Sequence, residues 1–314
     1  MLAEGWLCGR DLRAAPLSLT PSIERMSTSE GAPALAVTGS TGWLGGLVAR
    51  GLEELRVAQR LLVRDLARAP QLEGATVLQS TYGDSTANAE ALDGVSTLFM
   101  VSAAEHEKRL EEHRAFIDAA AGAGVEHIVY VSFFGAAPDA TFTLARDHFA
   151  TEEHIKASGM AWTFLRDNLY LEFTEAMVGP DGVIRGPAGD GRAAVVSHED
   201  IARVAVAVLA EPARHAGESY SLTGPEALIL SEAARVLTEV RGREVRFQDE
   251  TVEEAYRSRE VYGAPDWQVE AWVSTYLAIK AGELDGVTDD IERVTGRRPL
   301  SLRDYLAASE SSSS

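Results

Sequence analysis

Residues 35–45 read LAVTGSTGWLG, and this stretch decides the fold. A short apolar run, Leu35–Thr38, leads directly into three glycines, Gly39, Gly42 and Gly45, and then into a segment of helical periodicity. Gly39 permits a tight turn, Gly42 lets the backbone approach a diphosphate, and Gly45 lets the helix pack closely on the strand. The order strand, glycine turn, helix therefore predicts a dinucleotide-binding βα unit, with an ordinary tight turn as the alternative.

The dinucleotide is expected along the carboxyl ends of the strands. The start of the helix offers free N–H groups and the positive end of its dipole to phosphates. At this turn we predict contacts from Gly39, Ser40, Thr41, Gly42, Trp43, Leu44 and Gly45. Small residues at the ends of the fourth and fifth predicted strands leave room for the cofactor, and there we predict contacts from Val101, Ser102, Ala103 and Ser132.

The residue after the second predicted strand indicates which dinucleotide is bound. Arg64 follows Leu61–Val63 and offers a planar guanidinium to the 2′-phosphate of NADP, whereas an acid would accept the ribose hydroxyls of NAD. The alternative takes Asp65, about 20 residues after Gly45, as that acid. The sequence favours NADP(H) over NAD(H).

Short β-rich runs alternate with helical segments up to about residue 211, a pattern that predicts an α/β fold with a doubly wound parallel sheet. The expected strands are Leu35–Thr38, Leu61–Val63, Thr76–Leu78, Thr97–Val101, His127–Val131 and Trp162–Leu165. The clearest helix is expected over Glu105–Gly122, which a glycine ends. The stretch Gly179–Gly191 carries proline and glycines and is expected to be a loop.

The rhythm changes after residue 212. Helices are expected at Ser231–Arg241, Thr251–Tyr262, Trp267–Ala281 and Leu302–Ala308. We therefore predict an NADP-binding Rossmann domain over residues 33–211, with contributions from later segments, and a smaller, mostly helical substrate-binding region over residues 212–308. Residues 1–32 and 309–314 are expected to be disordered.

Composition argues against several classes of protein. Among 314 residues, 29 Lys and Arg face 48 Asp and Glu, and the net charge of −19 opposes binding to nucleic acid or to an anionic membrane. No apolar run approaches the roughly 20 residues of a membrane span. The single cysteine, Cys8, cannot form an intramolecular disulfide, and no histidine pattern predicts a metal site. We expect a soluble cytoplasmic protein, and both a monomer and a dimer fit the sequence.

Several motifs, in order along the chain, resemble those of the NmrA-like atypical short-chain dehydrogenase/reductases. They read TGSTGWLGG at 38–46, LLVRD at 61–65, HRAFIDAAAGAGVEHIVYVS at 113–132, HFATEEHIKASGMAWTFLR at 148–166 and SHEDIARVAVAVL at 197–209. The stretches 219–228 and 267–306 are similar to the branch that contains type 2 NAD(P)H:quinone oxidoreductases and triphenylmethane dye reductases. The resemblance spans residues 33–308 and implies a Rossmann domain, a small substrate domain and bound NADPH.

The chain departs from the pattern of short-chain reductases at two places. These enzymes carry Tyr-x-x-x-Lys after the fifth strand, and the corresponding residues here are His148 and Glu152. Relatives often place an aspartate near the adenine after the third strand, where this chain has Thr81 and Tyr82, so we expect Tyr82 at the cofactor. The first departure affects proton transfer to the substrate, and the second affects contacts with the adenine.

The missing acid pair narrows the expected reaction. Reduction of a simple ketone needs a positioned acid, whereas reduction of a quinone gives a phenolate-like anion and reduction of a cationic dye gives a neutral product. We therefore predict hydride transfer from NADPH to a quinone or similar electron-poor aromatic acceptor. The alternative is a catalytically silent NADP(H)-binding regulator.

The sequence also offers candidates for the acceptor pocket. His148 and Tyr170 are the candidate catalytic residues, the alternatives being a solvated helix histidine and a half-buried structural tyrosine. Phe133, Phe134 and Asn168 are expected to bind the acceptor, with the Trp267–Tyr276 region as a lid. Phe133 and Phe134 could also pack on the nicotinamide, and the alternative for each is an ordinary core aromatic residue.

Overall fold

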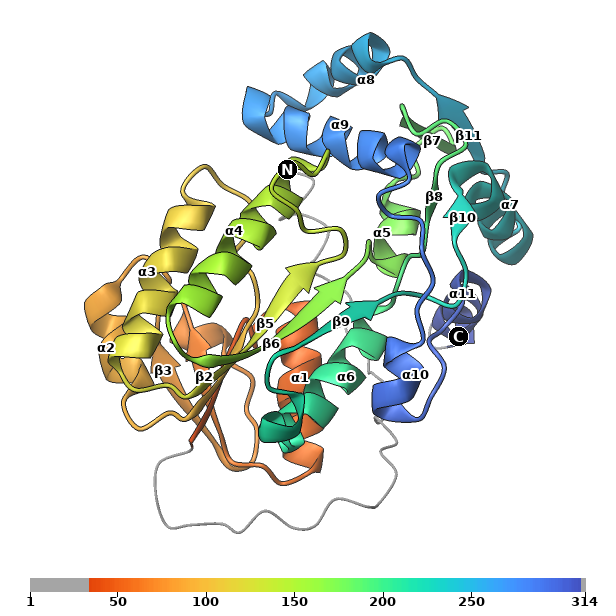
Figure 1. Ribbon diagram of the computed structural model, residues 1–314. Helices are drawn as coiled ribbons and strands as arrows, with labels where there is room; N and C mark the ends of the chain where they lie inside the picture. Colours follow the sequence, from red (N-terminus) through yellow and green to blue (C-terminus); the bar gives the residue numbers. More distant parts are fainter. Residues whose placement is uncertain (1–33, 312–314) are drawn as a thin grey trace.

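A parallel sheet of seven strands runs through the protein in the order β3-β2-β1-β4-β5-β6-β9 (Figure 1). The structure is a computed structural model that describes residues 34–311, so the expected N-terminal extension lies outside the described residues. The strands are β1 (Leu35–Thr38), β2 (Gln59–Val63), β3 (Ala75–Gln79), β4 (Thr97–Met100), β5 (His127–Phe133), β6 (Ala161–Asp167) and β9 (Glu218–Leu222). The six expected strands are all present, and the α/β fold is confirmed.

The seventh strand, β9, is the part of the sheet that the sequence pattern did not predict. It pairs in parallel with β6 and comes from beyond residue 211, so it is one of the later contributions to the Rossmann sheet. Its sequence, ESYSL, buries only Tyr220 and Leu222, because it lies at the edge of the sheet. Two apolar residues in an otherwise polar run give too weak a signal to predict a strand.

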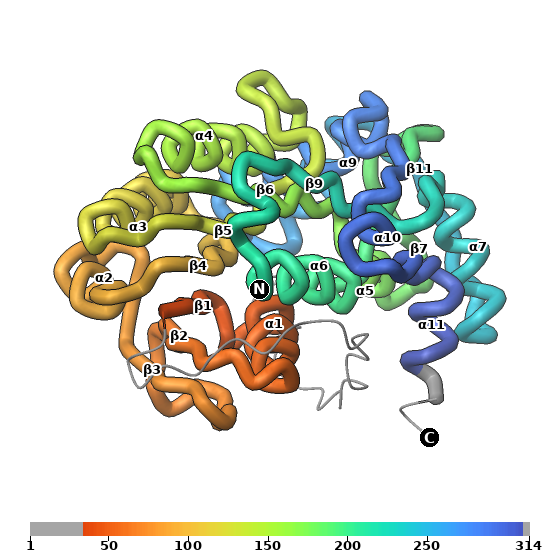
Figure 2. Tube along the Cα trace, turned by 60° about the horizontal axis from the view of Figure 1, so that its bottom comes forward, coloured from red at the N-terminus to blue at the C-terminus, as the bar shows by residue number. Residues whose placement is uncertain are grey.

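Helices cover both faces of the sheet (Figures 1 and 2). One face carries α1 (Trp43–Glu54), α6 (His198–Ala210) and α10 (Asp290–Thr295), and the other carries α2 (Ser85–Leu92), α3 (Arg109–Gly122) and α4 (Thr143–Ala157). Each face has its own apolar core. The expected start of α3 at Glu105 was wrong. The charged run 105–108 has no apolar residue to bury, and the helix begins only at Arg109.

A second region lies beyond the carboxyl ends of the central strands and has its own core (Figure 1). It contains α5 (Leu171–Ala176), α7 (Leu230–Arg241), α8 (Val252–Arg259), α9 (Asp266–Ala281) and α11 (Leu302–Ser311), with two small sheets made of β7 (Val183–Gly186) with β11 (Arg246–Asp249) and β8 (Arg192–Ala193) with β10 (Leu228–Ile229). Three 3₁₀ helices, η1 (Leu66–Arg68), η2 (Pro212–His215) and η3 (Glu260–Tyr262), complete the described elements.

Three expectations for this region need correction. The stretch Gly179–Gly191 is not all loop, because β7 forms within it by pairing with β11, a partner far along the chain. The helix expected over Thr251–Tyr262 ends at Arg259 and continues as η3. The last helix, α11, continues past Ala308 to Ser311, so residues 309–311 are helical. No helix of the described residues is long and apolar enough to span a bilayer.

Candidate functional site

The glycine turn between β1 and α1 has no room for side chains at its two ends. Gly39 adopts a φ of +67°, and a Cβ added there would lie 3.0 Å from the Cβ of Val101. A Cβ at Gly45 would lie 2.3 Å from the carbonyl oxygen of Gly39, so only glycine lets α1 cross the turn so closely. Gly42, between them, donates its N–H to the Gly39 carbonyl oxygen at 2.9 Å. The turn therefore exposes backbone at the start of a twelve-residue helix.

The polar groups of this turn fit a dinucleotide diphosphate. No side chain caps the start of α1, and its first turn contains no acidic residue. The first N–H groups of a helix have no partner within the helix, so here they remain available to an anion. The hydroxyl of Ser40 is buried and has no hydrogen-bond partner among the described residues. A buried hydroxyl without a partner is costly unless a ligand or water satisfies it, and a phosphate oxygen would do so.

The two charged residues after β2 have different surroundings. The carboxylate of Asp65 accepts a hydrogen bond from the Ala67 N–H at 3.0 Å and so caps the 3₁₀ helix η1. Arg64 is exposed, its backbone carbonyl accepts the side-chain amide of Gln79 at 3.0 Å, and its guanidinium has no ion pair among residues 34–311. Its guanidinium is the group next to the β2 end that is left for a ribose phosphate.

Tyr82 ties the ends of β1 and β4 together. Its hydroxyl donates to the carbonyl of Val101 and lies 2.7 Å from the Thr38 hydroxyl oxygen, while its ring stacks on Phe116 with centroids 4.3 Å apart. Burial raises the pKa of Tyr82. The Tyr82 hydroxyl is therefore used in hydrogen bonds within the protein. Contact between the Tyr82 ring and a cofactor stays a prediction.

His148 lies inside the protein and is not solvated, so the interpretation as a solvated helix histidine was wrong. It is 7% exposed, and both ring nitrogens have partners: Arg109 Nη2 at 2.9 Å from Nε2 and the Tyr130 hydroxyl at 2.9 Å from Nδ1. Because a guanidinium can only donate, Nε2 accepts, and the ring proton sits on Nδ1. Burial, together with the charge of Arg109, lowers the pKa of His148 well below its usual value. The ring is therefore neutral.

Glu152, which the motif comparison expects at the position of the usual lysine, is held by polar contacts inside the protein. Its carboxylate is fully buried, accepts the Ser132 hydroxyl at 2.6 Å and binds Arg166 through two nitrogens, at 2.8 and 2.5 Å. This arrangement joins α4 to β5 and β6. The side chain of Ser132 points toward α4, so only its backbone is left for a cofactor.

The remaining acceptor candidates fall into two groups. Phe133 packs against Phe142 at 5.0 Å and against His148 at 6.1 Å, and Phe134 is half-buried one residue later. Asn168 is fully buried, and its amide donates to the Leu284 carbonyl at 3.1 Å, so it joins β6 to the second region. Contact of Phe133, Phe134 or Asn168 with an acceptor stays a prediction.

Tyr170 belongs to a different group of aromatic rings. Its hydroxyl donates to Asp167 at 3.0 Å, and its ring packs on His198 with centroids 4.0 Å apart. His198 in turn stacks on Trp43, at 5.1 Å and nearly parallel. Burial raises the pKa of both Asp167 and Tyr170 well above their usual values. The stack connects the glycine turn to the end of β6, and it fits the interpretation of Tyr170 as a half-buried structural tyrosine.

The segment Trp267–Tyr276, expected as a lid, forms most of α9, and part of it packs against α4 and β7. Ser274 accepts the Thr143 N–H at 3.2 Å, and Tyr276 packs so closely on Gly186 that a Cβ there would lie 2.2 Å from its ring. Trp267 and Trp272 are half-buried. Sequence analysis missed Arg109, His113 and His198, because each has a partner distant in the chain. These partners are His148 for Arg109, Thr151 for His113 and Glu172 for His198.

Comparison with known proteins assigns the family. The NmrA-like family profile matches residues 32–304. The chain belongs to the NmrA-like family. This confirms the resemblance read from the motifs.

Three relatives of this NmrA-like protein are informative. The NAD(P)H azoreductase of Xenophilus azovorans is 32% identical over 281 residues, 87% of this chain and 97% of the azoreductase. The NADPH-dependent quinone oxidoreductase of Escherichia coli, whose structure is a complex with NADPH, has a TM-score of 0.81 and 31% identity over 88% of this chain and 99% of that chain. The triphenylmethane reductase of Citrobacter sp. has a TM-score of 0.78 and 30% identity over 88% and 98%.

The buried histidines of this NmrA-like protein predict a loss of stability in acid. Burial lowers the pKa of His113 well below its usual value; its Nε2 accepts the Ala103 N–H at 2.8 Å and its Nδ1 lies 3.0 Å from the Thr151 hydroxyl. Below pH ~6.5 His113 binds a proton in the unfolded chain but not in the folded chain. The free energy of unfolding is therefore highest above pH ~6.5 and decreases below it, by up to about 1.4 kcal/mol per pH unit for each such histidine.

We expect His113→Gln to flatten this dependence between pH 6.5 and 5, as measured by urea unfolding. Glutamine can accept from Ala103 and donate to Thr151 without titrating in this range. His106→Gln, at a half-exposed position in the segment before α3, is the control. Comparing each variant with the parent is essential, because the raised pKa of Asp167 acts in the opposite direction. An unchanged slope in His113→Gln would show that His113 does not titrate in this way.

Proposed function

We propose that this protein transfers hydride from NADPH to quinones or similar electron-poor aromatic acceptors. That it is an oxidoreductase is confirmed by its azoreductase and quinone oxidoreductase relatives. One observation carries the choice of acceptor. The turn at 39–45 retains a cradle for a diphosphate, while the positions of the usual acid pair hold a neutral His148 and a Glu152 already bound to Arg166.

The residues of the chain divide the work as follows. The turn residues Gly39 to Gly45 would bind the diphosphate through backbone N–H groups, with the Ser40 hydroxyl as a further donor. Bound NADPH supplies the hydride. Phe133 and Phe134 at the end of β5 would hold a flat acceptor against the nicotinamide and exclude water from it. No side chain needs to deliver a proton, since hydride transfer to a quinone gives a stable phenolate-like anion.

The preference for NADP(H) is part of this proposal and rests on Arg64. We expect Arg64→Ala to weaken NADPH binding by about tenfold to a hundredfold, because a charge-assisted contact with the 2′-phosphate is lost. NADH, which has no such phosphate, should bind with nearly unchanged affinity. Titration of both nucleotides against the variant and against Asp65→Ala measures this. Equal losses of the two nucleotides in Arg64→Ala would refute the assignment to Arg64, and a selective loss of NADH in Asp65→Ala would assign the ribose contact to Asp65.

A proton-donor role for His148 also stays a prediction, and it can be tested directly. With both ring nitrogens engaged and a lowered pKa, we expect His148→Ala to reduce kcat for a quinone less than tenfold at neutral pH. Tyr170→Phe is tested in the same way, since its proton is held by Asp167. A larger loss accompanied by a shifted pH profile would assign proton transfer to that residue.

The function is tested by following NADPH oxidation with a panel of acceptors. Menadione, an azo dye and a cationic triphenylmethane dye should be reduced, whereas acetophenone should not. Reduction of acetophenone at a comparable rate would contradict the argument from the missing acid. Tight NADP binding without turnover of any acceptor would favour the alternative, a redox-sensing regulator.

The proposal includes three further expectations. The region after residue 212 would help to enclose the acceptor, since α9 packs beside α4. Nucleic acid is not an expected partner, given the net charge of −19. A reducing, cytoplasmic location fits a chain with one cysteine.

A further inference from the structure

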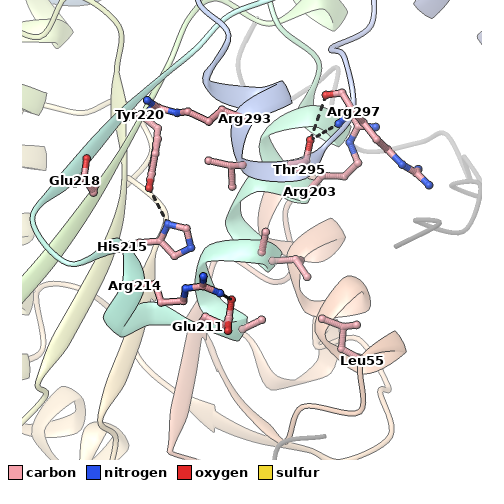
Figure 3. A pocket seen from close by; sticks show the side chains of 14 residues that line it. Leu55, Arg203, Glu211, Arg214, His215, Glu218, Tyr220, Arg293, Thr295 and Arg297 are labelled. Carbon is pink, nitrogen blue, oxygen red and sulfur yellow. Dashed lines mark hydrogen bonds and ion pairs between the residues drawn. The ribbon is translucent and has the colours of Figure 1, made fainter. Parts of the chain in front are cut away.

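A cavity lies at the carboxyl ends of helices α1 and α6, whereas the glycine turn lies at the amino end of α1. Figure 3 shows the residues that line this cavity. Its volume is about 580 Å³, within the range of small-molecule sites. It is bordered by Leu55 after α1, by the last turns of α6, by η2, by the start of β9 and by α10. Because α1 has twelve residues and a helix rises 1.5 Å per residue, roughly 18 Å separate this cavity from the turn. It is not part of the site proposed for NADPH.

The walls of this cavity combine positive charge with apolar surface. Four arginines line it, Arg203, Arg214, Arg293 and Arg297, against two glutamates, Glu211 and Glu218. An excess of arginine in one cavity is notable in a chain whose net charge is −19. The apolar part of the wall comes from Leu55, Val206, Ala207, Ala210 and Val294.

The four arginines differ in how far they are already neutralised. Arg203 binds the buried carboxylate of Asp200, and Arg214 binds Glu211 at 2.7 Å. Arg293 binds Asp290 at 2.5 Å and also covers the ring of Tyr220, 5.7 Å from its centroid. Arg297 is half-buried and takes part in no ion pair among residues 34–311. It is the arginine with a full charge left for a ligand.

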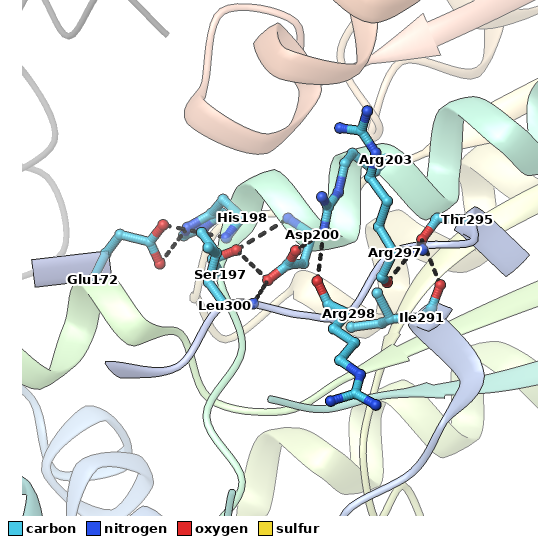
Figure 4. Close-up of polar contacts among 10 residues, drawn as sticks. All are labelled: Glu172, Ser197, His198, Asp200, Arg203, Ile291, Thr295, Arg297, Arg298 and Leu300. Atoms are coloured by element: carbon cyan, nitrogen blue, oxygen red, sulfur yellow. Dashed lines mark hydrogen bonds and ion pairs between the residues drawn. The ribbon is translucent and has the colours of Figure 1, made fainter. Parts of the chain in front are cut away.

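The cavity is also held in shape by polar contacts behind its wall (Figure 4). Asp200 accepts the Ser197 hydroxyl at 2.7 Å and the Leu300 N–H at 2.9 Å, besides binding Arg203. The Thr295 hydroxyl donates to the Ile291 carbonyl and accepts the Arg297 N–H at 3.2 Å. These bonds fix α10 and the segment after it against α6, so the arginines are presented from a built wall.

Neutral hydrogen-bonding groups complete the lining. His215 lies 2.7 Å from the Tyr220 hydroxyl, and burial lowers the pKa of this histidine. The ring is therefore uncharged at neutral pH and adds no net charge to the four guanidinium groups. Figure 3 shows His215 and Tyr220 on one side of the cavity, with Leu55 opposite.

We propose that this cavity binds a small organic anion, a molecule with an apolar body and a carboxylate, sulfonate or phosphate group. The oxyanion would lie near Arg297, which has no ion pair among residues 34–311, because a guanidinium binds such groups through two parallel N–H bonds. Arg293, which lies over the Tyr220 ring, would add positive charge from another side of the cavity (Figure 3). The body would lie against Leu55 and the Val206–Ala210 face of α6. Inorganic anions would leave that apolar wall uncovered, and neutral aromatics would leave Arg297 unpaired.

The test uses the full chain and two matched fluorescent probes in the presence of saturating NADP⁺. 8-Anilinonaphthalene-1-sulfonate carries the anion, and N-phenyl-1-naphthylamine is the same aromatic body without it. We expect the sulfonate to bind, and the double variant Arg293→Gln, Arg297→Gln to weaken it at least tenfold while the neutral probe changes little. Arg235→Gln with Arg243→Gln, two exposed arginines of α7 and the turn after it, removes the same charge elsewhere and should have no effect.

A second variant tests the cavity itself. Ala207→Trp should fill it and remove the sulfonate-dependent signal, with thermal unfolding used to show that the variant folds. If the sulfonate signal measured without nucleotide disappears when NADP⁺ is added, the probe occupies the cofactor site and the proposal is overturned. Equal weakening by the two double variants, or binding that survives both Ala207→Trp and the Arg293/Arg297 variant, would also overturn it. NADPH titration of the same variants reports on the proposed function independently.

Discussion

Replacing Gly42 by aspartate is expected to weaken NADPH binding at least a hundredfold while the protein stays folded. Gly42 precedes α1 with extended backbone angles that any residue adopts, and an added Cβ would meet only the Gly39 carbonyl oxygen, at 3.3 Å. Aspartate is a favoured residue before a helix, because its carboxylate accepts the free N–H groups and suits the positive end of the dipole. Those are the groups that the diphosphate would use.

Gly42→Asp is expected to change the affinity for NADPH without lowering the stability of the fold. We expect the melting temperature to be unchanged or to rise, while isothermal calorimetry detects no uptake of NADPH. Gly42→Ala, which adds the Cβ without the charge, is the control and should weaken binding far less. If Gly42→Asp binds NADPH like the parent protein, then the turn does not hold the diphosphate.

Replacing Glu152 by lysine is expected to destabilise the fold by more than about 3–5 kcal/mol, the usual result of breaking a buried ion pair. The substitution would place a lysine where the motif comparison expects the lysine of short-chain reductases. Here, however, the carboxylate side chain is fully buried and holds Arg166 and the Ser132 hydroxyl. A lysine would bury a second cation next to Arg166 and leave the Ser132 hydroxyl without its acceptor.

Urea unfolding of Glu152→Lys and of its neighbour Glu153→Lys measures the effect. Glu153 is half exposed on the same helix, where it pairs with Lys156, so its substitution changes the same charge at the surface. We expect Glu153→Lys to stay within about 0.5–1 kcal/mol of the parent. A Glu152→Lys protein as stable as Glu153→Lys would show that the buried pair does not hold α4 on the sheet.

The glycine turn was predictable from sequence because its determinants are local. A strand, a tight turn and a helix that crosses it require glycine at fixed spacing, and Gly39 and Gly45 have the close contacts that this predicts. The five inner strands were also predictable, since a strand covered on both faces is largely apolar, and the edge strand β3 was predictable from its short apolar run at Val77 and Leu78. The edge strand β9 and the strand β7 were not, because each depends on a partner distant in the chain.

The polar interior around α4 was likewise beyond sequence analysis. His148 was identified as a titratable residue at a suggestive position, but its state depends on Arg109, 39 residues earlier. No local pattern indicates that this arginine would be buried, or that it would donate to the ring and hold it neutral. Residue type at a motif position predicts that the usual acid pair is missing, whereas the contact of His148 with Arg109 follows only from the packing of α3 on α4.

The stack of Trp43 on His198 gives the protein a built-in optical reporter. Trp43 lies at the first position of α1, inside the turn proposed for the diphosphate, and its ring is nearly parallel to the imidazole. An indole fixed there emits where reduced nicotinamide absorbs. In a variant whose other four tryptophans are replaced by phenylalanine, its emission would therefore report nucleotide at the turn without an added label.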